Sequence, residues 1–261
     1  MIKSLYLGSI LAEYIEFTPS KISMDTELLL DTNFIISLID LNAPESTNTC
    51  NTLIDIAKKQ GYRLSILPET INEIKYLLQA KAENYNKSFM VQKIYTEDIY
   101  NACDRRNLTK VDLERIIDNI EQVISDFGIK KITNHTLIVE EALKSDSYEF
   151  YKTKRQSEIS AKHDAIALHY VRYKRGNQNI KDFIDVKCWF VNNAVSRNMI
   201  NNNHNKKFQP EIIKADDLLS ILWLSNPNIN SLVSANNIAN IGLSSLLSLT
   251  FTESLPKTSI S

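Results

Sequence analysis

The stretch Glu27-Leu-Leu-Leu-Asp-Thr-Asn-Phe-Ile-Ile-Ser-Leu-Ile39 decides the fold of this 261-residue chain. Leu28–Leu30 form an apolar run that is too short for a helix, and apolar residues return at helical spacing after the polar residues 31–33. This pattern predicts a buried strand, a polar tip and an amphipathic helix. A strand buried on both faces is typical of a parallel sheet covered by helices, whose working crevice lies at the carboxyl ends of the strands. We therefore expect Asp31 to lie at that crevice.

Asp31 and Thr32 also have a simpler interpretation, which is that one of them caps the helix that follows. Both residue types do this well. The stretch alone leaves the two roles open, and the choice depends on whether other carboxylates reach the same place.

The composition indicates an ordinary globular protein, with 43% hydrophobic and 23% charged residues. The net charge of −1 gives no overall attraction to nucleic acid, so a polyanionic partner would need local basic patches or a metal. Cys50, Cys103 and Cys188 are scattered and lack metal-ligand spacing, which favours a reducing compartment. No segment approaches the ~20 apolar residues that a bilayer crossing needs, so we expect a cytoplasmic protein without a membrane partner.

Strand and helix patterns alternate along the first part of the chain. Tyr62–Leu67 is the second strand candidate, and a helix is expected over Thr70–Ala80. This order predicts an α/β fold with three layers, α/β/α, around a central, mostly parallel sheet. The expected parts are a lead-in helix within residues 1–26, an α/β domain over 27–225 with a strand-free helical insertion at about 81–155, and a C-terminal helical segment with a loose tail over 226–261.

A second carboxylate stands near the start of the helix after the second strand, in Thr70-Ile-Asn-Glu73. Thr-x-x-Glu is a capping box, which explains both residues without any function. Glu73 could also face the crevice near Asp31, and the two roles do not exclude each other. Glu69 is a competing choice for that position.

Asp164 is the third carboxylate, within the helical pattern over Glu158–Val171. Ala161, Leu168 and Val171 lie on its face of the helix, so the carboxylate shares an apolar stripe. An isolated ionised carboxylate there would be costly, so it needs a partner or a metal. The alternative to a functional role is a buried salt bridge to a Lys or Arg.

The three motifs together resemble the PIN-domain nucleases. That family has an apolar strand that ends in Asp-Thr-Asn, then Thr-x-x-Glu at the head of a helix, then an Asp followed by small and apolar residues; these correspond here to Asp31, Glu73 and Asp164. The resemblance spans about residues 27–225 and implies a PIN-like fold and an RNA substrate, single-stranded or structured. Its usual fourth motif, Thr-x-Asp or Thr-Asn-Asp, falls here on residues 192–194, Asn-Asn-Ala. An asparagine can bind a cation through its carbonyl but carries no charge, so Asn193 is expected only to assist.

Three carboxylates that lie close together are expected to bind a divalent cation, which relieves their repulsion. At 4 Å and an effective dielectric of 20, two carboxylates repel each other by ~4 kcal/mol, and oxygen ligands suit Mg²⁺ or Mn²⁺. A bound ion would acidify a water and stabilise charge on a phosphodiester. Our hypothesis is a metal-dependent (endo)ribonuclease with Asp31, Glu73 and Asp164 as its catalytic and metal-binding residues. The resemblance also implies a homodimer or a partner protein.

Substrate contacts are predicted at two places. Thr32 and Asn33 are expected to position Asp31 or the phosphate. The basic clusters Arg105-Arg106, Lys152–Arg155 and Arg172–Arg175 could hold the polymer, and Arg172, Lys174 and Arg175 are the residues expected to do so. For each cluster alone a role without nucleic acid is the simpler account; Arg172–Arg175, for example, lies at a helix end, where the helix dipole favours cations. The histidines, His163 included, are weaker candidates as ligands.

Three other functions remain as alternatives. An aspartyl-phosphate enzyme usually needs a second acid two residues after the first aspartate, where this chain has Asn33. A nucleotide-binding module is disfavoured because the chain has five glycines and neither phosphate-loop motif. The main alternative is a catalytically degenerate PIN-like scaffold that binds RNA or protein, since the fourth acid is missing.

Overall fold

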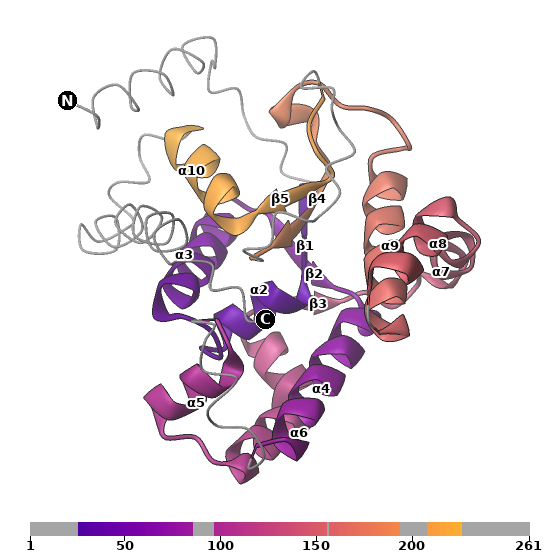
Figure 1. Ribbon diagram of the computed structural model, residues 1–261. Coiled ribbons are helices and arrows are strands. Elements are labelled where there is room, and N and C mark those ends of the chain that lie inside the picture. Colours follow the sequence, from indigo (N-terminus) through magenta and orange to yellow (C-terminus); the bar gives the residue numbers. More distant parts are fainter. Residues whose placement is uncertain (1–25, 86–96, 156, 194–207, 226–261) are drawn as a thin grey trace, which may run out of the picture.

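The computed structural model describes residues 26–85, 97–155, 157–193 and 208–225. They form an α/β fold on a five-stranded, all-parallel sheet with the strand order β3-β2-β1-β4-β5 (Figure 1). The predicted α/β class and the parallel sheet are confirmed. The strands are β1 (Glu27–Leu30), β2 (Arg63–Ile66), β3 (Lys130–Lys131), β4 (Cys188–Asn192) and β5 (Ile212–Lys214).

Helices cover both faces of this sheet. Leu28 and Leu30 point into a large core with helices α2 to α6 and α10, whereas Leu29 points into a second core with α7 and α9. This alternation is the two-residue period of a strand that is buried on both faces. The helices are α2 (Thr32–Leu38), α3 (Pro44–Lys59), α4 (Pro68–Glu83), α5 (Ile99–Arg106), α6 (Lys110–Asp126), α7 (Thr136–Leu143), α8 (Asp146–Lys154), α9 (Glu158–Lys174), the short 3-10 helix η2 (Phe183–Asp185) and α10 (Ala215–Ser225).

The strand order reverses beside β1. From β1 the chain passes through β2 to β3 on one side, and then returns to β4 and β5 on the other. Leu30 pairs with Val191, and the amide of Asp31 donates to the carbonyl of Val191 at 3.0 Å. The next residues, Asp31 and Asn192, therefore lie side by side at the switch point, where open parallel sheets bind their ligands.

The start of α4 differs from the expectation. The helix begins at Pro68, with Leu67 in the cap position and without a side-chain cap. Proline suits the first turn because the N–H that it lacks would have no partner there. Thr70 therefore lies inside the helix, so the predicted capping box with Glu73 is not formed and the carboxylate of Glu73 is free for other contacts.

The stretch predicted to be a strand-free insertion contains a strand. β3 pairs in parallel with β2 at the edge of the sheet, through Ser65–Lys130 and Ile66–Lys131. Its two residues are exposed lysines, so it carries no apolar pattern that a sequence could reveal. Helices α5 and α6 thus belong to a connection within the sheet, and α7 and α8 pack against α9.

Several predicted features lie outside the described residues, among them the lead-in helix and the segment over 226–261. Within the described ranges, no helix combines the length and apolar character that a membrane crossing requires. Cys50, Cys103 and Cys188 are buried and form no disulfide.

The end of the sheet opposite Asp31 holds a buried acid. Glu27 is 4% exposed; it accepts a hydrogen bond from the hydroxyl of Tyr170 at 3.0 Å and pairs with Lys174 Nζ at 2.9 Å. Burial alone would raise the pKa of Glu27, but hydrogen bonds from Ser65, Lys174 and Tyr170 outweigh it, so the pKa is lowered. The ionised carboxylate therefore stabilises the folded state.

We expect Glu27→Gln to lower the free energy of unfolding by ~2 kcal/mol at about pH 7, because a buried charged hydrogen-bond network is broken. The pKa of Glu27 is lower in the folded state than its unfolded value of about 4.5. The ionised carboxylate therefore stabilises the fold fully at pH values above 4.5, and this stabilisation is lost as the pH falls through the folded-state pKa. Urea denaturation at about pH 7 and pH 3.5 should therefore show the difference from wild type shrinking in acid.

Glu121→Gln is the matched control, since Glu121 pairs with Lys75 and Lys131 but its side chain is 47% exposed. Exposed pairs contribute little, so this variant should lose much less stability. Equal losses in the two variants, or a loss in Glu27→Gln that does not change with pH, would contradict the assignment.

Candidate metal centre

Asp31, Glu73 and His163 meet at the carboxyl end of β1. Asp31 directly follows β1, Glu73 lies in the second turn of α4, and His163 lies in the first half of α9. One ligand atom from each residue lies within 4.8 Å of the other two. The structure thus brings together two of the three predicted carboxylates and adds a histidine.

Neither Asp31 nor Thr32 acts as a helix cap through its side chain. Asp31 occupies the cap position of α2 but makes no side-chain cap hydrogen bond. The hydroxyl of Thr32 donates instead to Glu73 Oε2 at 2.5 Å, which ties the start of α2 to α4. Glu69, the competing choice, contacts His135 Nε2 at 3.0 Å and is not part of the cluster. Glu73 is therefore the carboxylate that faces Asp31.

The ligand atoms of the cluster are buried and poorly satisfied. Asp31 and His163 are 3% and 1% exposed, and within the described residues Asp31 Oδ2 and both ring nitrogens of His163 have no aligned hydrogen-bond partner. His163 Nδ1 lies 2.9 Å from Glu73 Oε2, and Nε2 lies 3.8 Å from Asp31 Oδ1. Buried polar atoms normally have partners. Two carboxylates and an imidazole that converge in this way fit the ligand set of a divalent cation.

The pKa values show how the charges are balanced without a metal. Burial raises the pKa of Asp31 to about 7; His163 opposes this shift, and the charges of Glu73 and Asp164 add to it. Burial would also raise the pKa of Glu73, but His163 outweighs it and the pKa is lowered to about 2. Burial disfavours the charged imidazole, but Asp164 and Glu73 overcome this and raise the pKa of His163 well above its ordinary value. A protonated imidazole here balances the carboxylates, and metal binding would displace its proton.

Asp164 has a different partner from the one predicted. Its Oδ2 accepts a hydrogen bond from Arg155 Nε at 2.5 Å, and its Oδ1 lies 3.5 Å from His163 Nδ1. The salt bridge raised as an alternative is therefore formed. Asp164 lies beside the cluster of Asp31, Glu73 and His163, and it does not belong to the set whose ligand atoms converge.

Asn193 also turns away from the cluster. Its side-chain amide donates to Ser37 Oγ in α2 at 2.9 Å. Phe190 points into the core shared with α9, so alternation along β4 places Asn192 on that face and Asn193 on the other. Asn192, which is buried at 3% exposure, is therefore the residue of β4 beside Asp31.

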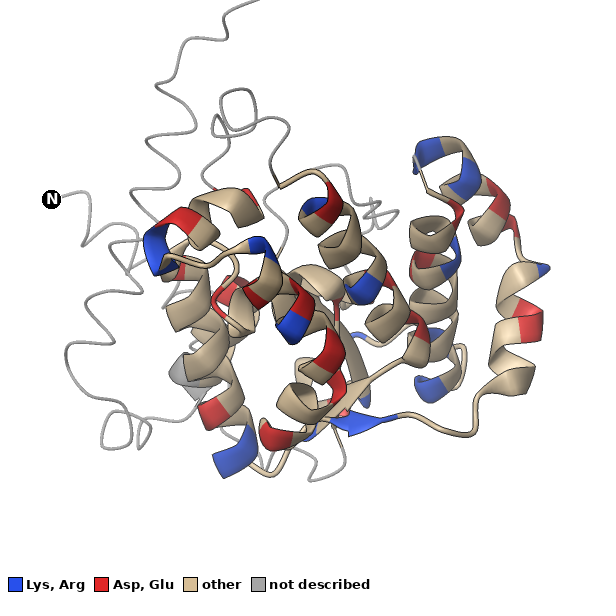
Figure 2. Cartoon of the chain, turned by 90° about the horizontal axis from the view of Figure 1, so that it is seen from below, with Lys and Arg blue, Asp and Glu red and all other residues tan. Residues whose placement is uncertain are grey.

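The predicted substrate-binding cations lie at the C-terminal end of α9, where each already has a partner within the protein. Lys174 is about 15 Å along the helix from Asp164. Figure 2 shows basic and acidic residues interspersed over the described helices. Asn33 is half-buried, and its carbonyl accepts a hydrogen bond from Ser37. The cations hold internal partners: Lys174 pairs with Glu27, Arg172 with Glu211, and the buried Arg175 donates to the carbonyls of Cys188, Gln209 and Pro210.

His163 and Arg155 are the site residues that sequence reasoning undervalued. A signal for His163 exists, because Ile166, Ala167 and Tyr170 follow it at helical spacing and all three are buried. Arg155 belongs to the basic cluster Lys152–Arg155, but its pairing with Asp164 carries no sequence signal, since it depends on how α8 and α9 pack together.

Comparison with protein-family models, with curated proteins and with solved structures finds no match for this chain.

We expect Mn²⁺ to raise the melting temperature of the wild-type protein by roughly 5 °C when it is supplied well above its dissociation constant. Asp31→Asn and His163→Gln should each abolish this shift, measured against the metal-free melting temperature of the same variant. Asp118→Asn, an exposed acid on α6, is the control and should keep it. A shift of equal size in all variants would place the metal elsewhere.

Proposed function

We propose that this protein is a metal-dependent nuclease that hydrolyses phosphodiester bonds in single-stranded or structured RNA. The observation that carries the proposal is the cluster of Asp31, Glu73 and His163 at the switch point of a parallel sheet, in which buried ligand atoms of Asp31 and His163 have no aligned partner among the described residues. The resemblance of the sequence motifs to PIN-domain nucleases supports the choice of RNA. A PIN-like, three-layer arrangement is part of the same proposal.

The ligand set favours Mn²⁺ over the Mg²⁺ that carboxylates alone would suit. An imidazole nitrogen binds transition metals well, whereas Mg²⁺ prefers oxygen ligands. When bound, the ion would lower the pKa of a water molecule and stabilise negative charge on the phosphate.

The protein's own groups fix the geometry of this centre. The hydroxyl of Thr32 holds Glu73 in place. Asp164 contacts both His163 and Arg155, so it orients one ligand and one cation at once. The low exposure of Asp31 and His163 keeps bulk water away from the ligands. This arrangement leaves Glu73 and Arg155 as the groups nearest to the surface.

Arg155 is the residue that would bind the phosphate. Only its Nε is used by Asp164, its terminal N–H groups have no partner among the described residues, and its side chain is 38% exposed. The charges of Asp31 and Glu73 also act on it, so it lies close to the cluster. Guanidinium groups bind phosphate oxygens through two parallel hydrogen bonds.

A catalytically degenerate PIN-like scaffold that binds RNA or protein is the second candidate. Two observations favour it: the residue of β4 beside Asp31 is Asn192 and carries no charge, and Arg155 neutralises Asp164. Such a scaffold would keep the fold without binding a divalent cation at Asp31.

Cleavage of labelled single-stranded RNA and DNA with Mn²⁺ tests the proposal directly. Wild type should cleave RNA, chelation should stop cleavage, and Asp31→Asn, Glu73→Gln and His163→Gln should each be inactive because a ligand is lost. Asp118→Asn should remain active. Absence of cleavage by wild type, together with absence of a metal-dependent stabilisation, would instead establish the scaffold.

Arg155→Ala should lower kcat/KM by about a hundredfold, and Arg155→Lys should recover part of it, since a lysine keeps the charge but not the bidentate geometry. Loss of Arg155 also leaves Asp164 buried without its partner, so stability must be separated from activity. The double variant Arg155→Ala/Asp164→Asn removes both charges and should regain stability without regaining activity. Recovery of activity in the double variant would show that Arg155 only balances Asp164.

A further inference from the structure

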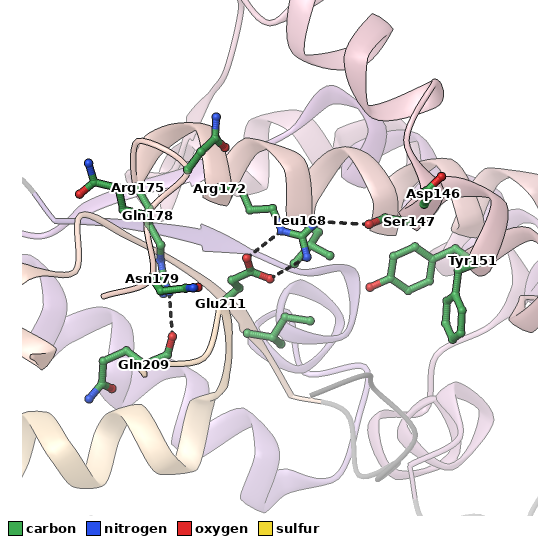
Figure 3. Close-up of a pocket in the computed structure, with 13 residues that line it drawn as sticks. Asp146, Ser147, Tyr151, Leu168, Arg172, Arg175, Gln178, Asn179, Gln209 and Glu211 are labelled. Atoms are coloured by element: carbon green, nitrogen blue, oxygen red, sulfur yellow. Dashed lines mark hydrogen bonds and ion pairs between the residues drawn. The ribbon is translucent and has the colours of Figure 1, made fainter. Parts of the chain in front are cut away.

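A cavity of about 560 Å³ lies between α8, the second half of α9 and the chain that leads into β5 (Figure 3). Tyr151 lies at one end of the cavity, and Gln178, Asn179 and Gln209 lie at the other. The volume is within the usual range for sites that bind small organic molecules.

Two residues that line the cavity lie close in sequence to the Asp164–Arg155 pair. Tyr151 on α8 lies four residues before Arg155, and Leu168 on α9 lies four residues after Asp164. Residues four apart are neighbours on one helix face, about 6 Å apart. The charges of Asp164 and Arg155 both act on the phenol of Tyr151, whose pKa is raised to about 12, chiefly by burial. The Tyr151 end of the cavity is therefore the end nearer to the Asp164–Arg155 pair, although neither of these two residues lines it.

The charged groups of the lining are balanced. Asp146 and Glu211 contribute two carboxylates, and Arg172 and Arg175 contribute two guanidinium groups. Arg172 is satisfied by Glu211 and by the hydroxyl of Ser147, at 2.7 and 3.2 Å. This lining has no excess charge to attract a phosphate, which favours a ligand whose main contacts with it are neutral and polar.

Amide groups dominate the uncharged part of the lining. Four side-chain amides line the cavity, and those of Gln178 and Asn179 belong to exposed residues. Each amide offers both donors and an acceptor, which is the pattern that reads the edge of a nucleobase. Leu168 and Ile212 supply apolar surface for a flat ring. The chemistry of the cavity thus suits a base.

We propose that this cavity binds one nucleoside of the RNA substrate, with the base at the end formed by Gln178 and Asn179 and the 5′-phosphate at the Tyr151 end, which is the end nearer to Arg155. The inference rests on the proposed nuclease function and gives it a base preference at one position of the substrate. Sequence-selective recognition of RNA typically reads such unstacked bases.

Binding of the four ribonucleoside 5′-monophosphates to metal-free protein tests this inference. Ligand-observed NMR in the presence of EDTA should show that wild type binds at least one of them, with a preference of about tenfold over the weakest. Gln178→Ala/Asn179→Ala should lose this preference. The control, Asn119→Ala/Gln122→Ala, removes two exposed amides of α6 and should keep it.

Ribose 5-phosphate is the probe that separates the base from the phosphate. It should compete poorly, since it lacks the base. Three outcomes would each overturn the inference. They are equal binding of ribose 5-phosphate and the nucleotides, a base preference that survives Gln178→Ala/Asn179→Ala, and no nucleotide binding at about 10 mM. Because the metal is absent, the result is independent of cleavage. A protein that prefers one base but never cleaves RNA would refute the nuclease and leave the base site standing.

Discussion

The desolvation of Asp31 is the constraint on which the rest of the site depends. This carboxylate follows a central strand that has one hydrophobic core on each face, and burial raises its pKa to about 7. A buried charge needs a counter-charge. The fold supplies it from α9, whose His163 lies between Asp31 and Glu73, and Asp164 and Arg155 form a second layer of charge around that histidine.

The sequence was sufficient for the fold class and for the position of Asp31. Three consecutive leucines before a polar tip occur where a strand is covered on both faces, and the parallel sheet follows from that. Glu73 was also found, through the Thr-x-x-Glu motif after the second strand, although the capping box which that motif predicts is not formed. The strand at Lys130–Lys131 was missed, since its pairing with β2 comes from the chain connection and not from apolar side chains.

The charge partners could not be predicted in the same way. Whether Asp164 binds a metal or an arginine depends on where α8 ends relative to α9, and that is a tertiary relation. The same holds for Arg172, Lys174 and Arg175, which looked available for a polymer but hold Glu211, Glu27 and three backbone carbonyls. Long cationic side chains find such internal partners readily, so a basic cluster in a sequence is weak support for a nucleic-acid surface.

The energetics of the cluster bear on the choice between an enzyme and a retired scaffold. Burying charged groups together is expensive, and replacing such groups with apolar residues of similar volume is often neutral or stabilising. Asp31 and His163 are almost fully buried, and yet Asp31 Oδ2 and both ring nitrogens of His163 lack aligned hydrogen bonds among the described residues, so these groups contribute less to stability than a satisfied network would. A scaffold that only binds a partner gains nothing from this arrangement. A centre that exchanges a proton on His163 for a divalent cation does gain from it, because the ligands are already held in place before the ion arrives.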